Sequence, residues 1–230
     1  MFKSLKYIWM MILSASLAFA QYTEAYDLWE VTPFYVINTS NTLAESLRHE
    51  DIDYLDSYAL GVNFGKVLIR DPWGLPVDGI ATTGLIWHNE AGFQDNFLQH
   101  TVLLKWSWKQ FPWSFHLRTR FEIGTGASFT WKISEAEQKN RTVDGQYEGS
   151  RHLLNYNEFS LGFNVQDLIG LVNSEARDNE SLDRLWLMMG ITHRSGAWGL
   201  WGESTHPVTC ERQGVEGAWN AYYIGLKKTF

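Results

Sequence analysis

The stretch RLWLMMGITHRS, residues 184–195, alternates between two kinds of side chain in the way expected of a membrane strand. Alternate residues of a strand share a face. One face is apolar at positions 185, 187, 189 and 191 and then ends in His193 and Ser195. The other face carries Trp186, Met188, Gly190, Thr192 and Arg194. A potential base and a potential nucleophile therefore end an apolar stripe, and if that stripe faces lipid, we expect these two groups to face lipid too.

Seven further segments show the same two-residue period, and each has roughly the length that a tilted membrane strand needs. The eight predicted strands lie near 28–38, 56–69, 79–89, 99–109, 113–124, 154–166, 184–195 and 218–230. The stretch 126–133 could extend the fifth strand past a bulge at 124–126. The longest polar links are near 39–54, 134–152, 167–183 and 196–217. Long links mixed with tight turns are typical of long outer loops and short periplasmic turns. The pattern predicts an all-β fold, an eight-stranded antiparallel transmembrane β-barrel of the outer-membrane type.

The alternation alone leaves open which face of the barrel is outside. A soluble lipocalin-like barrel buries its apolar face, whereas a membrane barrel turns that face outward. Charged residues share the polar faces with glycine and serine, as a cramped and charge-paired interior would require; they include Lys105, Arg118, Arg120, Glu122 and Glu158. Many of the twelve Trp lie near predicted strand ends, which fits either interfacial girdles or a Trp-rich core. The last strand ends in Phe230, as is usual for outer-membrane barrels, and the membrane barrel is therefore favoured.

The N-terminus is typical of a secretory signal. Lys3 and Lys6 precede a short apolar run, and Ala18-Phe19-Ala20 fits a small-x-small cleavage site. We expect residues 1–20 to be a signal peptide and 21–230 to be the barrel domain.

The composition argues against several other classes of protein. The net charge of −7 comes without a basic patch, which argues against nucleic-acid binding. Seven scattered His and the single Cys210, expected to be a free loop thiol, give no clustered ligands for a metal.

The residue types near the seventh predicted strand suggest nucleophilic catalysis. A serine hydroxyl is a weak nucleophile unless a base removes its proton and a third group orients that base. His193 and Ser195, two residues apart on one face, supply the first two roles. Glu216, just before the last strand and of the same parity as Phe230, is a candidate for the third, with Glu203 and Glu211 as alternatives in the preceding link.

His193-Arg-Ser195 on the penultimate strand, followed by Gly214-Val-Glu216 before the last, resembles the lipid A 3-O-deacylase family of the PagL type. The resemblance implies an eight-stranded outer-membrane barrel with a lipid-facing triad: His193 as base, Ser195 as nucleophile and Glu216 as acid. It implies lipid A as substrate and no cofactor. Gly196 stands where the family has Asn, so its backbone N–H would have to serve the oxyanion. The competing hypothesis is a non-catalytic structural or adhesion barrel whose long loops carry the function.

Overall fold

The computed structural model describes residues 28–41, 43–48, 52–140, 142–143, 146–147, 152–173, 179–195, 204–205, 212–213 and 219–230. The predicted signal peptide, residues 1–20, lies outside these ranges. Among the described residues, no helix has the length and the apolar character needed to cross a membrane.

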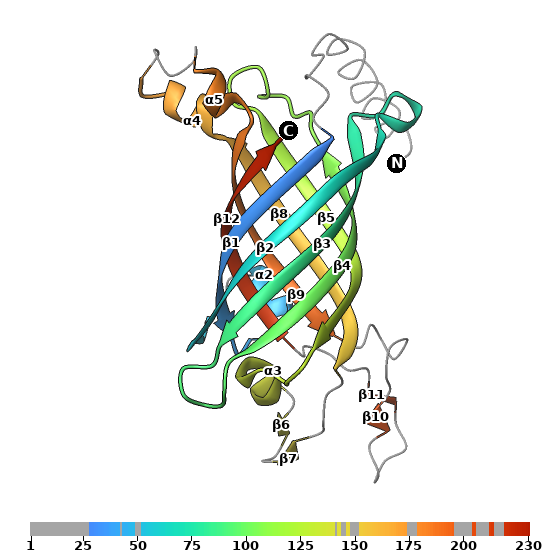
Figure 1. Ribbon diagram of the computed structural model, residues 1–230, viewed down its shortest axis with the longest axis vertical. Helices are drawn as coiled ribbons and strands as arrows, with labels where there is room; N and C mark the ends of the chain where they lie inside the picture. The colour runs from blue at the N-terminus through green and yellow to red at the C-terminus, as the bar shows by residue number, and fades with distance from the viewer. Residues whose placement is uncertain are drawn as a thin grey trace, which may run out of the picture.

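Eight long strands form the wall of the molecule (Figure 1). They are β1 (Trp29–Thr39), β2 (Tyr54–Arg70), β3 (Val77–Asn89), β4 (Phe97–Trp108), β5 (Thr119–Thr130), β8 (Leu153–Asn164), β9 (Leu185–Ser195) and β12 (Trp219–Thr229). Shorter elements lie in the links: helices α2 (Leu43–Arg48), α3 (Glu135–Asn140), α4 (Val165–Gly170) and α5 (Glu180–Asp183), the 3-10 turn η1 (Pro72–Gly74), and the two-residue strands β6 (Thr142–Val143), β7 (Gln146–Tyr147), β10 (Ser204–Thr205) and β11 (Arg212–Gln213).

The eight strands close into one antiparallel barrel in the order β1-β12-β9-β8-β5-β4-β3-β2. The first strand pairs with the last, for example Tyr35 with Ile224, which confirms the predicted closure. Closure leaves no strand edge in the wall, so the backbone groups there are satisfied between neighbours.

The interior is polar and charged. Lys227 Nζ lies 2.9 Å from Glu30 Oε2 and 2.5 Å from Glu122 Oε1, and Lys105 Nζ lies 2.5 Å from Glu158 Oε1. All five of these charged side chains are almost completely buried. Unpaired charges would be costly in such a place, and these are paired as predicted.

The exterior is apolar. Side chains that point outward are exposed in the isolated chain, among them Leu60, Leu85, Val102, Leu104, Leu161, Ile224 and Leu226. Small residues on the inner faces leave room for large rings. A side chain at position 61 would place its Cβ atom 2.2 Å from the Phe34 ring, so only glycine fits there while the ring keeps its place. An apolar outer wall around a charged interior is the arrangement of a transmembrane barrel, and it excludes the soluble alternative.

The fifth strand and Arg118 differ from the sequence-based predictions. The fifth strand is Thr119–Thr130 rather than 113–124. It passes through Gly124–Gly126 without a register shift, and residues 113–117 instead form a turn. Arg118 therefore lies in the link rather than inside the barrel, where it binds Asp167 and Asp183.

Trp186 and Trp219, which lie near the ends of predicted strands, are buried inside the barrel, whereas Trp29, Trp106, Trp113 and Trp131 are exposed. Arg120 lies over the Trp186 ring, 4.2 Å from its centroid. A cation–π contact of this kind stabilises an aromatic side chain in a charged interior.

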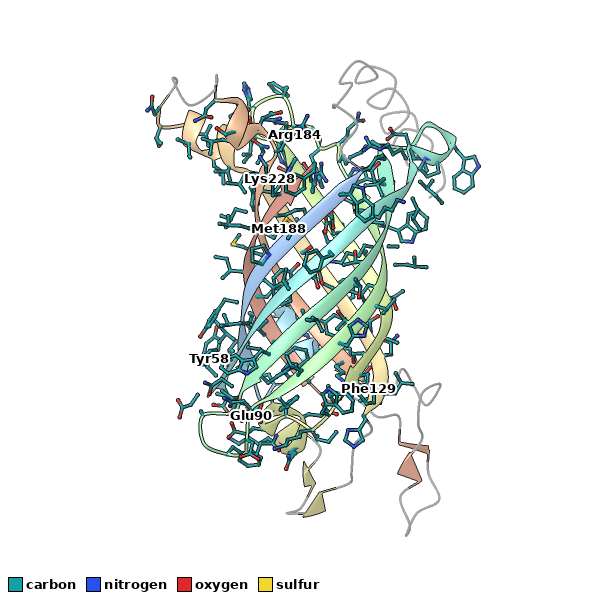
Figure 2. All side chains as sticks on the ribbon, in the orientation of Figure 1. Tyr58, Glu90, Phe129, Arg184, Met188 and Lys228 are labelled. Atoms are coloured by element: carbon teal, nitrogen blue, oxygen red, sulfur yellow. The ribbon has the colours of Figure 1, made fainter. Side chains whose placement is uncertain are left out.

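The two ends of the barrel differ. Strands β1, β3, β5 and β9 end, and β2, β4, β8 and β12 begin, at the end of the barrel where α3 lies, at the bottom of Figure 1. The chain ends of the barrel and the links 71–76, 109–118 and 165–184 lie at the other end. Figure 2 shows Glu90 at the α3 end and Arg184 and Lys228 toward the opposite end. The long link 167–183 thus connects strands at the opposite end of the barrel from the strands that the other three long links connect.

Helix α3 closes its end of the barrel through buried polar contacts. Arg194 points inward from β9, forms an ion pair with Glu137 of α3, and donates from Nε to Ser128 Oγ at 2.9 Å. It also donates to the carbonyl of His152 at 2.8 Å. Ala136 and Glu137 are buried as a result. The lumen is filled at this end rather than open.

Candidate active site

The end of β9 brings together polar side chains from three strands on the outer wall. His193 is paired in register with Asn220 of β12 and with Asn157 of β8, and Ser195 is paired with Asn155 of β8. Residues directly opposite each other in an antiparallel pair share a face, with Cβ atoms about 4.5–5.5 Å apart. Since Met189 and Ile224, of the same parity, are exposed on the outside, this polar cluster also belongs to the outer face.

The cluster is covered rather than exposed to lipid. The exposed fraction is 8% for His193 and 5% for Ser195, compared with 42% for Met189 on the same stripe. Helix α2 of the β1–β2 link packs against β12 and β9, the strands that carry Asn220 and His193. Tyr222 donates its hydroxyl to the carbonyl of Ser46 in α2, at 2.6 Å. The parity of His193 and Ser195 was predicted correctly, but the expectation that they would face lipid directly was wrong, because both side chains are buried.

The hydrogen bonds of Asn220 determine the tautomer of His193. A backbone carbonyl only accepts, so the Asn220 atom that lies 2.7 Å from the Asn41 carbonyl must be the Nδ2 donor. The other atom of that amide, Oδ1, therefore faces His193 Nδ1 at 2.7 Å. Since Oδ1 only accepts, Nδ1 must carry the hydrogen, and Nε2 of the neutral imidazole keeps its lone pair. Nε2 is the nitrogen that can act as a base.

Asn155 and Asn157 form a line of amides beside Ser195 and His193. Asn157 Nδ2 donates to Asn155 Oδ1 at 2.5 Å, and Asn155 Nδ2 donates to the carbonyl of Gly126 at 2.9 Å. These bonds fix the amide of Asn155 opposite the Ser195 hydroxyl. The arrangement thus provides a hydroxyl, an imidazole with an available lone pair and nearby amide donors, which are the groups that acyl transfer requires.

The remaining predicted site residues, Glu216 and Gly196, lie outside the described residues, as do Glu203, Glu211 and Cys210. The structure brings His193 and Ser195 into one cluster and assigns the Nδ1 contact to Asn220. Among the described residues, no group of three or more His, Cys, Asp and Glu is arranged to hold a metal ion.

The three asparagines were missed in the sequence. Asn155 and Asn157 share the parity of Phe159 and Leu161 on a lipid-facing stripe, and Asn220 shares that of Ile224 and Leu226. An amide on such a stripe is costly unless it is bonded. Polar residues on an otherwise apolar face were therefore the signal that could have identified them.

The chain matches no family model, and no curated protein matches its sequence. Solved structures that are similar to it include two outer-membrane proteins. One is described as the crystal structure of the outer membrane enzyme PagL: TM-score 0.47, 11% identity, covering 87% of this chain and 99% of that chain. The other is the outer membrane protein OprG from Pseudomonas aeruginosa: TM-score 0.34, 11% identity, covering 89% of this chain and 96% of that chain. At these values, the function has to be argued from this chain's own side chains.

Proposed function

We propose that the chain is an outer-membrane serine esterase that removes an ester-linked acyl chain from lipid A. The observation that carries the proposal is the bonding of Asn220, which leaves His193 Nε2 as the basic nitrogen in the cluster that contains Ser195. A buried histidine held in one tautomer by a second group is the arrangement that activates a serine. Here the orienting group is an amide, as in the Cys-His-Asn variant of the triad.

The proposed reaction has two steps. The Ser195 hydroxyl gives its proton to His193 Nε2 while Oγ forms a bond to the ester carbonyl carbon. The tetrahedral intermediate collapses, the bond to the sugar oxygen breaks, and that oxygen takes the proton from Nε2. A water molecule then gives a proton to Nε2 and attacks the acyl carbon. Ser195 Oγ leaves with the proton, and the fatty acid is released.

The oxyanion of each tetrahedral intermediate needs donors close to Ser195. Asn155, opposite Ser195 on β8, is the candidate among the described residues, and its amide takes the place of the family asparagine that Gly196 replaces. The backbone N–H of Gly196 remains a second candidate. A preorganised donor contributes most when it is held by other bonds, as Asn155 is by the Gly126 carbonyl.

The position of the cluster near one end of the barrel supports a lipid substrate. Ser195 is the last residue of β9, at the end of the barrel where most of the long links connect strands. In outer-membrane barrels the longer loops are extracellular. The cluster would then lie at the outer leaflet, where lipid A is found, and would be reached from the side of the barrel. The filled interior argues against entry through the lumen.

A structural barrel is the second candidate function. The observation that favours it is the burial of Ser195, together with a neutral amide rather than a carboxylate on His193. On this reading the asparagines and His193 only fasten the β1–β2 link to the wall.

The two functions differ in whether Ser195 reacts as a nucleophile. Purified barrel in lipid vesicles is treated with a fluorophosphonate, and the intact mass is measured. The esterase proposal expects one phosphonyl adduct on wild type and none on Ser195→Ala. Ser128→Ala, which removes an inward-facing hydroxyl, is the matched control and should still be labelled. A folded wild-type barrel that gains no adduct would favour the structural candidate.

A further inference from the structure

We infer that helix α2 (Leu43–Arg48) is a lid over the polar cluster that opens to admit substrate; this inference rests on the proposed esterase function and adds its regulation. In the structure the lid is closed. It packs against β9 and β12, on a face of the barrel that is elsewhere open to lipid. An ester cannot reach Ser195 while only 5% of that residue is exposed, so turnover requires the cover to move.

Two hydrogen bonds join the lid and the neighbouring Asn41 to β12. Tyr222 donates to the Ser46 carbonyl, and Asn220 Nδ2 donates to the Asn41 carbonyl. Both acceptors are backbone carbonyls. Exposed backbone groups could bond instead to water or to lipid headgroups once the lid lifts, so opening exchanges these bonds rather than simply losing them.

Hydrogen bonds join the two ends of the link to each other. Ser40 Oγ lies 2.5 Å from Asp53 Oδ2, and the Ser40 N–H donates to the Asp53 carbonyl at 3.1 Å. The Asp53 N–H in turn donates to Asn41 Oδ1 at 2.7 Å. These hydrogen bonds keep both ends of the link together, so the helix can move away from the wall while the strand ends stay paired.

The closed position also buries a polar atom without a hydrogen bond, and opening would expose that atom to water. Among the described side chains with buried polar atoms, Ser46 Oγ has no hydrogen-bond partner. A buried hydroxyl without a partner destabilises the state that buries it. Ser46 therefore favours the open state, whereas Tyr222 favours the closed one, and the balance between them makes the lid a switch rather than a fixed part of the wall.

The test measures access to position 195 without relying on catalysis. Ser195→Cys is made in a Cys210→Ser background, which leaves one thiol, and its alkylation rate by a maleimide is measured in vesicles. Adding Tyr222→Phe removes one fastening bond and is expected to raise the rate about tenfold, the change that one lost hydrogen bond produces in an equilibrium. Adding Ser46→Ala removes the unsatisfied hydroxyl and is expected to lower the rate several-fold.

Tyr35→Phe is the matched control, since this outward tyrosine on β1 contacts Tyr58. Its rate should equal that of the parent. Heat-modifiable migration of each variant shows that the barrel is folded. Equal alkylation rates in the parent and its three variants would overturn the lid inference. Faster alkylation after Ser46→Ala would also overturn it.

A second experiment distinguishes a failure of the lid inference from a failure of the esterase proposal. With Ser195 intact, fluorophosphonate labelling should be faster in Tyr222→Phe than in wild type. If the alkylation rates differ among the variants but fluorophosphonate labels none of them, the lid is supported and the esterase proposal is rejected. Labelling of Ser195 at one rate in all variants would retain the esterase and reject the lid.

Discussion

Replacing Lys227 with methionine tests whether the charged faces of the strands point into the barrel, because Lys227 is a buried charge there. The Lys227 side chain is 1% exposed and forms ion pairs with both Glu30 and Glu122. Methionine has a similar length but no charge. The substitution removes the cation and leaves two carboxylates inside the barrel, with Ser107 Oγ still bonded to Glu122 at 3.3 Å.

The expected loss is large because a buried ion pair is broken from one side. Removing one partner of such a pair costs about 3–5 kcal/mol, most of it from the uncompensated charge that remains. Adding Glu122→Gln to Lys227→Met removes one of the stranded charges, and we expect it to restore roughly 1–3 kcal/mol.

The free energy of unfolding is measured by urea titration of the barrel in vesicles, with heat-modifiable gel migration as the second readout. Lys228→Met is the matched control. That neighbouring lysine lies on the outer face and donates to the Ser181 carbonyl, at 3.0 Å, so its loss should cost about 1 kcal/mol or less. Equal effects of the two substitutions would refute the assignment of inner and outer faces.

Three further predictions follow from particular contacts. Asn220→Leu removes the acceptor that holds the His193 tautomer, and ester hydrolysis should fall by roughly 100-fold or more while the barrel stays folded, as followed with a chromogenic ester. Arg194→Met breaks the buried contacts to Glu137 and Ser128, and urea titration should show a loss of about 3–5 kcal/mol. Burial raises the pKa of Glu90, so its folded form holds a proton that the unfolded chain has already lost; stability should therefore fall as pH rises from about 4.5 through the raised pKa, and Glu90→Gln should flatten that slope in urea titrations at several pH values.

The barrel could be predicted from the sequence because a two-residue period is a local property. His193, Ser195 and Arg194 were assigned to the correct faces by parity alone, and the pairing of the first and last strands followed from the need to close the wall. The fifth strand was misplaced because the turn at 113–117 also alternates. Trp113, Phe115 and Leu117 mimic a strand, but the chain turns there and Arg118 is drawn to Asp167 and Asp183.

The candidate site was predicted only in part because its remaining members come from distant segments. Asn220 is 27 residues from His193, and the helix that packs against their strands begins at Leu43. The strand register brings Asn220 opposite His193, and no local pattern encodes that register. The search for a third group was restricted to acids, so an amide in that position was overlooked.

The central claim is that Ser195 cleaves an ester of a membrane lipid, and the most direct test is mass spectrometry of lipid A from cells that express the chain. Wild type should produce lipid A lighter by one acyl chain, and Ser195→Ala, expressed at the same level and equally heat-modifiable, should leave lipid A intact. Unchanged lipid A in cells that carry folded wild-type barrel would contradict the claim.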